Sequence, residues 1–348
     1  MNKFAFLIHP IEVQDFYKRF PLLKKAPSIL MENLATTISP FKLSQIKGIQ
    51  TPKGEIEGYF IFVPFTTRKI FELSEKRVLK KLLKACKIAQ RLEVNIIGLG
   101  GFTSTIGNEG VILSENFSIP ITTGYTYSVV TAIDGIKKVV QGLGKEFKEC
   151  EILVVGENTS ISHVVVRYLA REAKYLTLAS KNKEKSEVLF EEILQQTGTV
   201  IHISQDIDSA MKRGDILFIT DTIDNSHLKS IKKEAFICDL SNDKKVTIEL
   251  KKSRQDLFFV DGGILTLPTA VELGEDLEIS SNRCSPSLVE TILLTLEERW
   301  ECFSLGKKLE LEKMDRIKKL AEENNIQLTG VSSLYKEIFF GKRNSLDN

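Results

Sequence analysis

The amino-acid sequence predicts an α/β protein with two domains, on three observations. The 348-residue chain is 42% hydrophobic, so it can bury a sizeable core and is long enough for two domains. From residue 151 onward, short apolar stretches alternate with stretches of helical periodicity, which is typical of parallel strands joined by right-handed crossovers. After residue 286 the apolar spacing becomes helical. The middle of the chain is therefore predicted to form a Rossmann-like, doubly wound parallel sheet, and its two ends a second α/β domain.

The first 145 residues are predicted to mix strands and helices. Residues 1–13 indicate a first strand rather than a signal peptide. Residues 58–65 (GYFIFVPF) are aromatic and β-branched, which favours a strand. In residues 75–92 the apolar side chains recur at helical intervals opposite a lysine-rich face, which predicts an amphipathic helix. Residues 94–110 indicate a buried strand with a loop rich in glycine and hydroxyl groups, and residues 122–143 a turn followed by a helix.

Residues 146–270 carry the regular alternation and are predicted to be the Rossmann-like domain. The expected strands are EILVVG, YLTLAS, TVIHIS, DILFIT, AFICDL and LFFVDGG. The expected helices are 161–172, 183–196, 206–212 and 225–231. Residues 271–340 are predicted to be helices that return to the N-terminal domain (residues 1–145), and residues 341–348 a frayed polar tail.

Charge and composition exclude several classes of protein. The chain has 48 Lys and Arg against 46 Asp and Glu and no basic stripe with interleaved aromatics, so we expect no nucleic-acid partner. Its basic pairs, such as Lys80-Lys81, are interpreted as solvated faces. Five scattered cysteines and four histidines show no metal-ligand spacing, so no metal site is predicted. No apolar run reaches the roughly 18 residues of a membrane span, and the cysteine usage favours a reducing, cytoplasmic setting.

The turn after the first strand of the middle domain resembles a cofactor turn that lacks most of its glycines. Such turns use three glycines, for tight turning, for approach to a pyrophosphate and for helix packing. Here Gly156 is followed by Glu157, Asn158, Thr159 and Ser160. Their polar groups can donate to a phosphate at the helix N-terminus, or they can simply cap the helix. Judged on these residues alone, self-capping is the favoured interpretation.

Two lysines follow the second strand of this domain. Lys181 and Lys183 stand where the ribose of a bound adenosine would lie, and no acidic residue is there to accept from a 2′-hydroxyl. Lysines at this place suit the 2′-phosphate of NADP, so the predicted cofactor is NADPH. The alternative is a pair of exposed loop lysines without a ligand.

Eight segments carry a resemblance that spans nearly the whole chain. They are FAFLIHP (4–10), EGYFIFVPFTTRKI (57–70), GLGGFTSTIGNEG (98–110), ITTGYTYSVVTA (121–132), FICDLSN (236–242), VDGGILTLP (260–268), VETILLTLEERW (289–300) and FSLGKKLELEKMDRIKKLAEENN (303–325). In these segments the chain resembles the bacterial long-chain acyl-(acyl-carrier-protein) reductases, which are shikimate-dehydrogenase-like. The resemblance implies a Rossmann NADPH domain and a second domain for the acyl chain. It also implies that a cysteine thiolate attacks the thioester of acyl carrier protein or coenzyme A, and that hydride transfer releases a fatty aldehyde.

The resemblance also assigns candidate catalytic residues. The nucleophilic cysteine of the family corresponds to Ser287, three residues before Glu290, and a serine hydroxyl needs a dedicated base. Cys284 is the substitute candidate, because Arg283 and the start of the helix would lower its pKa. Ser287 and Glu290 also fit a capping box, in which Ser287 is a structural cap.

The resemblance further places an acyl-thioester pocket in the first domain. The matching positions are Arg68, Gly101, Thr103, Ser104, Thr123 and Gly124, for which a tight interface loop is the alternative. Departures at the nucleophile, the phosphate turn and residues 240–245 predict a divergent reductase of weak or absent activity. The alternative is a pseudoenzyme that binds acyl chains or acyl carrier protein, or regulates a paralogous reductase. A dehydrogenase of a small hydroxy acid is disfavoured, because no lysine–aspartate pair is placed for it.

Overall fold

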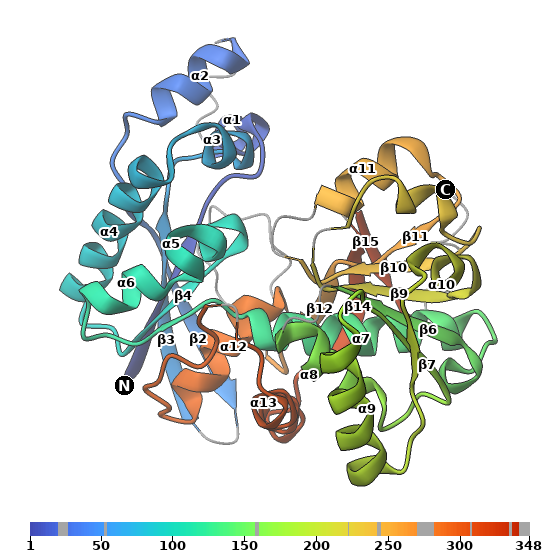
Figure 1. The fold of residues 1–348 in the computed structure, drawn as a ribbon. Coiled ribbons are helices and arrows are strands. Elements are labelled where there is room, and N and C mark those ends of the chain that lie inside the picture. Colours follow the sequence, from blue (N-terminus) through green and yellow to red (C-terminus); the bar gives the residue numbers. More distant parts are fainter. Residues whose placement is uncertain are drawn as a thin grey trace. The chain divides into compact units, whose positions relative to one another are not determined.

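The computed structural model divides into two compact units. The residues that it describes are 1–19, 27–51, 54–156, 160–221, 223–241, 245–269, 282–306, 308–333 and 336–340. Unit 1 comprises Met1–Tyr127, Leu265–Lys307 and Arg316–Gln327, and unit 2 comprises Ser128–Ile264, Lys308–Asp315 and Leu328–Asn348. Figure 1 shows a sheet with helices in each unit, so the predicted α/β class is confirmed. The domain boundaries drawn from the sequence stay predictions.

The sheet of unit 1 is mostly parallel, in the order β2-β3-β1-β4-β5. Its strands are β1 (Asn2–Ile8), β2 (Phe41–Thr51), β3 (Gly54–Phe62), β4 (Ile96–Leu99) and β5 (Ile121–Thr122). β1 lies parallel between β3 and β4, while β2 runs antiparallel along β3. Phe4, Ala5, Phe6 and Leu7 of β1 are all buried, because a central parallel strand is covered on both faces.

Helices of unit 1 bury the side chains that recur at helical intervals. They are α1 (Val13–Arg19), α2 (Ser28–Ala35), α3 (Thr67–Glu72), α4 (Glu75–Arg91), α5 (Ile106–Glu109), α6 (Val111–Asn116) and α12 (Pro286–Leu296), with a 3-10 helix η2 at Gly101–Thr105. Val78, Leu82 and Ala89 of α4 lie in the core, as the periodicity predicts.

One lysine of α4 contradicts the interpretation of the basic pairs as solvated. Lys81 is buried, and its ammonium donates to the carbonyl oxygens of Ala35, Thr36 and Pro64 at 3.2, 3.0 and 3.4 Å. Burial lowers the pKa of Lys81 to about 8. The fold brings these three acceptors together from distant segments, so the local sequence around Lys81 gives no sign of them.

Unit 2 holds a six-stranded sheet in the order β11-β10-β9-β6-β7-β8. Its strands are β6 (Glu151–Val155), β7 (Tyr175–Ala179), β8 (His202–Ser204), β9 (Ile216–Ile219), β10 (Phe236–Asp239) and β11 (Phe258–Phe259). Every neighbouring pair is parallel. The first strand of the unit lies at the centre, as in a Rossmann fold, so the predicted doubly wound sheet is confirmed.

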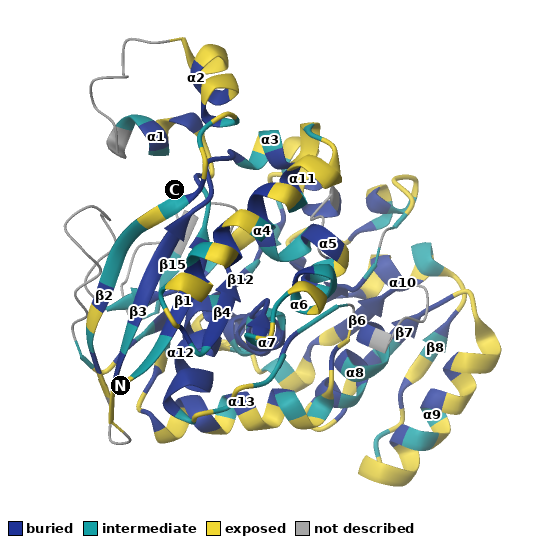
Figure 2. Ribbon diagram, turned by 90° about the vertical axis from the view of Figure 1, so that its left-hand side faces the viewer, coloured by how far each residue is buried: buried dark blue, intermediate teal, exposed yellow. Residues whose placement is uncertain are grey.

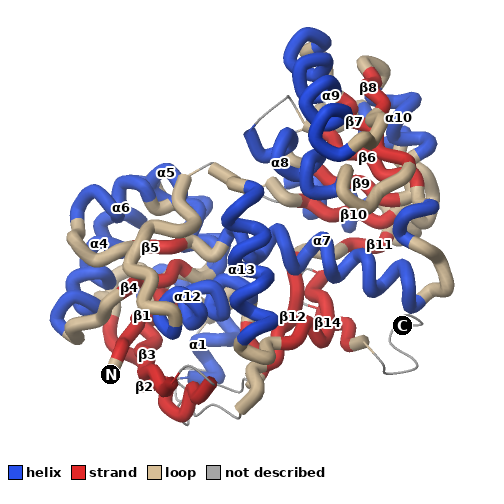
Figure 3. Tube along the Cα trace, turned by 90° about the horizontal axis from the view of Figure 1, so that it is seen from below, coloured by secondary structure: helices blue, strands red, loops and turns tan. Residues whose placement is uncertain are grey.

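Helices lie on both faces of this sheet. They are α7 (Tyr125–Gly142), α8 (Ser160–Leu169), α9 (Lys183–Thr197), α10 (Ile207–Arg213) and α11 (Lys245–Ser253), with 3-10 helices η3 (Phe147–Glu149) and η4 (His227–Ser230). Met211 of α10 and Leu250 of α11 share a core cluster with Leu153 and Leu217 of the strands. Figure 3 shows α8 and α9 on the other side of β6 and β7 from α10. The helix expected at 225–231 is the shorter η4.

The C-terminal part differs from the predicted run of helices. α12 and α13 (Leu311–Glu323) are present, but β13 (Arg283–Cys284) pairs antiparallel with β12 (Gly262–Thr266). β14 (Gln327–Ser333) likewise pairs with β15 (Lys336–Phe339). The prediction that residues 271–340 form helices is therefore wrong at these strands. The segment QLTGVSS shows no regular alternation of apolar and polar residues, so its periodicity did not indicate a strand.

Burial in both units follows the sheets. In Figure 2 the strands are largely dark blue, while yellow, exposed residues mark the outer faces of helices such as α4 and α9. Within the described ranges, no helix combines the length and apolar character needed to cross a membrane.

Candidate functional site

A cavity of about 390 Å³ lies at the carboxyl ends of β6 and β7 in unit 2. Val155 and Gly156 border it from β6, and Ala179, Ser180 and Lys181 from β7. From β6 the sheet grows one way through β7 to β8, and the other way through β9 to β11. Open α/β sheets bind ligands outside the carboxyl ends of their strands at such a reversal. The cavity therefore lies where this class of fold binds ligands.

Gly156 is required by the close approach of two strand ends. A Cβ atom at this position would lie 2.1 Å from Oγ1 of Thr220, the residue that follows β9. Thr220 is itself buried, and its hydroxyl donates to the carbonyl oxygen of Val155 at 3.1 Å. Only bare backbone at residue 156 therefore fits between Thr220 and the cavity.

Apolar side chains supply part of the lining. Ile207 begins α10 and Ile223 follows β9, and both border the cavity. They also pack against the core cluster that contains Val155 and Ala179. Small-molecule pockets are typically lined by apolar groups, with a few polar groups that fix the orientation of the ligand.

The polar rim carries charges of both signs. Lys181 is exposed and has no hydrogen-bond or ion-pair partner among the described residues. Asp224 accepts from the backbone N–H of Ser226 at 2.8 Å. Hydrogen bonds from Ser226 lower the pKa of Asp224, and the charges of His227 and Lys181 add to this effect. A carboxylate and an unpaired ammonium thus face the same cavity from different loops.

The residues predicted to bind a cofactor are only partly brought together here. Gly156 and Lys181 line the cavity, whereas Lys183 lies on α9 with its ammonium 3.5 Å from the carboxylate of Glu187. Ser160 is the first residue of α8. Asn158 and Thr159 lie outside the described residues, so the choice between phosphate binding and self-capping stays a prediction.

The residues that α10 and the segment after β9 contribute to the cavity were not predicted from the sequence. These are Ile207, Ile223, Asp224 and His227. The available signal was positional, because the predicted strand DILFIT ends just before residues 221–227. At a Rossmann switch point, the loops after the first and fourth strands of the domain border one crevice.

The candidate nucleophile Cys284 is a buried residue of β13 in unit 1. Burial raises the pKa of its thiol to about 12. The expectation that Arg283 and the helix start lower this pKa is wrong, because Cys284 is buried and loss of solvent disfavours the thiolate. The thiol is therefore protonated at neutral pH and is a poor nucleophile.

The predicted capping box around Ser287 is also wrong. Ser285 is the N-cap of α12, and its hydroxyl accepts from the backbone N–H of Leu288 at 3.4 Å. Ser287 lies one position inside the helix after Pro286, and its hydroxyl is 3.2 Å from that of Ser285. Proline favours the first position of a helix, so Pro286 fixes the start of α12 two residues earlier than the capping box needs.

Glu290 reaches across unit 1 rather than back to the start of its own helix. It is fully buried and accepts from the hydroxyl of Thr122 at 2.6 Å and from the backbone N–H of Tyr127 at 3.0 Å. Burial raises the pKa of Glu290, and these hydrogen bonds oppose the shift. Between its two partners, Gly124 has a φ of 72°, and a Cβ there would lie 2.2 Å from Cα of Ser287. Glu290 thus holds a tight loop against α12.

Other residues predicted to bind an acyl group are bonded within the same unit. The hydroxyls of Thr103 and Ser104 donate to the carbonyl oxygens of Gly100 and Gly101, both at 2.7 Å. Gly101 has a φ of 54° and lies against His9, since a Cβ there would be 2.7 Å from Nε2 of the imidazole. These groups shape a loop at the end of β4.

Arg68 and Thr123 also have partners inside unit 1. Arg68 forms an ion pair with the buried Glu32, which also accepts from the hydroxyl of Thr66 at 3.2 Å. The hydroxyl of Thr123 donates to the carbonyl oxygen of Ser304 at 3.2 Å. None of the six predicted acyl-binding residues borders the cavity of unit 2 described above.

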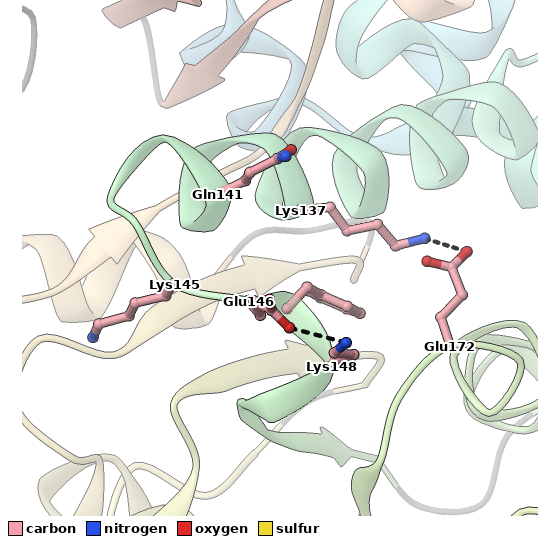
Figure 4. A pocket seen from close by; sticks show the side chains of 7 residues that line it. Lys137, Gln141, Lys145, Glu146, Lys148 and Glu172 are labelled. Atoms are coloured by element: carbon pink, nitrogen blue, oxygen red, sulfur yellow. Dashed lines mark hydrogen bonds and ion pairs between the residues drawn. The ribbon is translucent and has the colours of Figure 1, made fainter.

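A second cavity of unit 2, of about 630 Å³, is lined by lysines, most of which form ion pairs with glutamates. Its lining is Lys137, Gln141, Lys145, Glu146, Phe147, Lys148 and Glu172 (Figure 4). Lys137 lies 2.9 Å from Glu172 and Lys148 lies 3.0 Å from Glu146. These pairs make it a surface hollow with compensated charge rather than an anion site.

No protein-family model matches the chain. Among curated proteins, it is 24% identical over 354 residues to the aminotransferase PigE of a Serratia species, a match that covers 97% of this chain and 41% of that protein. The chain thus spans less than half the length of this relative. L-tryptophan dehydrogenase from Nostoc punctiforme matches 93% of this chain and 80% of its own at 10% identity, with a TM-score of 0.35. Shikimate 5-dehydrogenase from Listeria monocytogenes, in complex with shikimate and NAD, matches 97% and 93% at 9% identity, with a TM-score of 0.33.

The curated relative overturns the resemblance to acyl-(acyl-carrier-protein) reductases, because it is named as an aminotransferase. The predicted formation of fatty aldehyde, and the alternative of a pseudoenzyme of that family, are therefore wrong. The segments that carried the resemblance include turns and buried strands such as residues 98–110, whose groups bond within unit 1 and reflect its folding. The partners that it implied, acyl carrier protein, acyl-CoA or a paralogous reductase, stay predictions.

The broader part of the cofactor prediction is supported. The sheet of unit 2 has the strand order of a Rossmann fold, a fold that binds dinucleotides at its strand-order reversal. Among the described residues, no three histidine, cysteine, aspartate or glutamate side chains are grouped so that they could hold a metal ion.

Proposed function

We propose that the chain is an oxidoreductase domain that binds NADP(H), with the adenosine end of the dinucleotide in the cavity at β6 and β7. The cavity itself carries the proposal, because it lies at the reversal of a Rossmann strand order. When bound, the nicotinamide would supply or accept a hydride. The residues of unit 2 described here bind and orient the adenosine end.

The residues at the cavity fit a dinucleotide. Thr220 leaves no room for a side chain at residue 156, so Gly156 presents only backbone to the cavity, as close approach of a pyrophosphate requires. α8 begins at Ser160, shortly after this turn, and a helix N-terminus attracts a phosphate through its free N–H groups and its dipole. Both features favour an anionic ligand at the carboxyl end of β6.

Lys181 is the reason to propose the phosphorylated cofactor. It follows β7, where the adenosine ribose of a dinucleotide lies in this fold, and none of the described residues pairs with its ammonium. Asp224 faces the cavity from the other loop and already accepts from Ser226, so it does not neutralise Lys181 through a direct ion pair. A 2′-phosphate would give Lys181 the anionic partner that it lacks.

Titration of the protein with NADPH and NADH, followed by nicotinamide fluorescence, tests the proposal. Replacing Lys181 with alanine (Lys181→Ala) is expected to raise the Kd for NADPH by about tenfold and to leave the Kd for NADH nearly unchanged, because one charge-assisted contact to the 2′-phosphate is lost. The matched control is Lys183→Ala, since Lys183 lies two residues further along and interacts with Glu187.

The outcomes separate two parts of the proposal. If the wild-type protein binds neither cofactor at millimolar concentration, the dinucleotide site is rejected. If Lys181→Ala weakens NADPH and NADH equally, the cavity binds dinucleotides but Lys181 does not contact the 2′-phosphate. If Lys183→Ala weakens NADPH as much as Lys181→Ala does, the contact is not specific to Lys181.

A further inference from the structure

A histidine borders the proposed adenosine cavity, and one of its ring nitrogens faces an acidic residue. His227 is the first residue of η4, and its side chain lines the cavity. Its Nδ1 is buried and lies 3.1 Å from Oδ1 of Asp208 on α10. The side chain of His227 is 20% exposed. One edge of the ring thus points to a carboxylate inside unit 2.

The carboxylate of Asp208 is held in place and stays ionised. The hydroxyl of Ser230, at the end of η4, donates to Oδ1 of Asp208 at 2.6 Å. The hydrogen bond from Ser230 and the nearby imidazole of His227 lower the pKa of Asp208. A charged carboxylate beside Nδ1 favours the ring form that carries its proton on this nitrogen, because the two nitrogens of a neutral imidazole share one proton.

The other ring nitrogen then presents a lone pair. With the proton on Nδ1, Nε2 of a neutral histidine is a hydrogen-bond acceptor. None of the described residues bonds to Nε2 of His227. Ser180, another polar group of the lining, is almost fully buried and already accepts from the backbone N–H of Asn182 at 3.2 Å. His227 is therefore an acceptor at the cavity that lacks a donor.

We propose that His227 reads the base at the adenosine end, with Nε2 accepting from the exocyclic amine of adenine. This inference rests on the proposed dinucleotide site. The apolar side chains of Ile207 and Ile223 suit the faces of a flat base, and the acceptor selects among bases by their edges. Hypoxanthine carries a carbonyl oxygen where adenine carries its amine. With hypoxanthine, the carbonyl oxygen of the base and Nε2 of His227 would both be acceptors, so no hydrogen bond could form between them.

Comparison of NADP with its hypoxanthine analogue, deamino-NADP, tests the inference directly. At about pH 8, where histidine side chains are ordinarily neutral, we expect the wild-type protein to bind NADP roughly tenfold more tightly than deamino-NADP by isothermal titration calorimetry. In His227→Phe the aromatic ring remains but the acceptor is lost, so the preference is expected to fall to within about twofold. His202→Phe replaces an exposed histidine of β8 that does not line the cavity, and it should retain the wild-type preference.

The wild-type comparison decides the inference even if a variant fails to fold. Equal affinity of the wild-type protein for NADP and deamino-NADP overturns the reading of the base by His227 but leaves the dinucleotide site intact. Absence of binding to both rejects the dinucleotide site and this inference together. A preference that persists in a folded His227→Phe protein assigns the selection to another group and also overturns it.

Discussion

The polar groups that border the unit 2 cavity differ from the polar groups around Glu290 in unit 1 in whether they have hydrogen-bond partners. Glu290 is fully buried, and its oxygens are occupied by Thr122 and Tyr127. At the cavity, by contrast, the ammonium of Lys181 and Nε2 of His227 have no partner among the described residues. A buried polar group that is fully bonded stabilises the fold, whereas an unpartnered group at a cavity is available to a ligand.

This contrast explains why the catalytic residues predicted from the sequence were placed in the wrong region. Cys284, Ser287 and the residues around Gly124 were assigned to a reactive centre by the family resemblance. In the structure the thiol is buried with a pKa of about 12, and Gly124 is packed against Ser287. The residue types of an active site were present, but their surroundings make them part of the scaffold.

The largest expected effect comes from breaking the scaffold at Glu290. Glu290→Ala leaves the hydroxyl of Thr122 and the backbone N–H of Tyr127 without their acceptor inside unit 1. Buried donors without partners are costly, so the free energy of unfolding should fall by about 3 kcal/mol. Urea denaturation measures this change. Glu115→Ala, at an exposed position of α6, is the control and should change stability by less than about 0.5 kcal/mol.

The same variant also tests the contrast between the two regions. If Glu290 acts only through the scaffold, the folded fraction of Glu290→Ala should bind 2′,5′-ADP, a probe of the adenosine cavity alone, with the wild-type Kd. A Kd that rises by tenfold or more in folded protein would show that the two regions are not separable in this way.

A smaller effect is expected where the cavity meets the sheet of unit 2. Gly156→Ala places a Cβ 2.1 Å from Oγ1 of Thr220, so the strand ends must shift, at a cost of about 2 kcal/mol in the free energy of unfolding. Thr220→Ala removes that oxygen, and the double variant should recover part of the loss in a double-mutant cycle. Gly142→Ala, in an exposed helical position with no atom within 4 Å of the new Cβ, should be neutral or stabilising.

The coupling between the two substitutions distinguishes close packing from a purely local backbone effect. Additive losses in the double variant would show that the contact with Thr220 does not fix the glycine. The single variant should also weaken binding of 2′,5′-ADP, because the strand end that borders the cavity moves. Wild-type affinity in Gly156→Ala would contradict the assignment of this backbone to the ligand site.

The fold of unit 2 was predictable from the sequence because its signals are local. Each strand of the sheet is a short apolar run, and the connections between them force a parallel order. Gly156 and Lys181 could be placed at the carboxyl ends of their strands by the same reasoning. Their place at the cavity follows from the connectivity of the sheet alone.

The rest was not predictable because it depends on contacts between distant residues. Glu290 accepts a hydrogen bond from Thr122, which lies 168 positions earlier, and the sequence around neither residue indicates this pair. Cys284 pairs with Leu265 of β12, and Lys81 finds its acceptors at the end of α2 and after β3. His227 and Asp208 come from separate segments that the fold brings within 3.1 Å. Periodicity reports which face of an element is buried but not which polar groups meet there.

The smallest expected effect is a pH dependence of stability from the loop that follows β4. Nε2 of His9 accepts from the backbone N–H of Phe102 at 3.1 Å, and Nδ1 lies 3.0 Å from the carbonyl oxygen of Pro10. This requires a neutral ring with its proton on Nδ1, and burial lowers the pKa of His9. Below about pH 6.5 the unfolded chain takes up a proton that the folded chain excludes, so the free energy of unfolding should fall as the pH drops. Urea denaturation at a series of pH values above the range of the carboxylates measures this slope.

The variant His9→Gln sharpens the comparison between the two regions. Glutamine offers an acceptor to Phe102 without titrating, so the slope of stability against pH should become shallower. Burial also lowers the pKa of His163 in unit 2, which will leave part of the slope in place and should be removed by a further His163→Gln substitution. A slope that His9→Gln leaves unchanged would show that the ring does not stay neutral in the folded protein. In that case His9 would take up a proton in the folded protein. The contrast between the fully bonded polar groups of unit 1 and the unpartnered groups at the unit 2 cavity would then no longer hold.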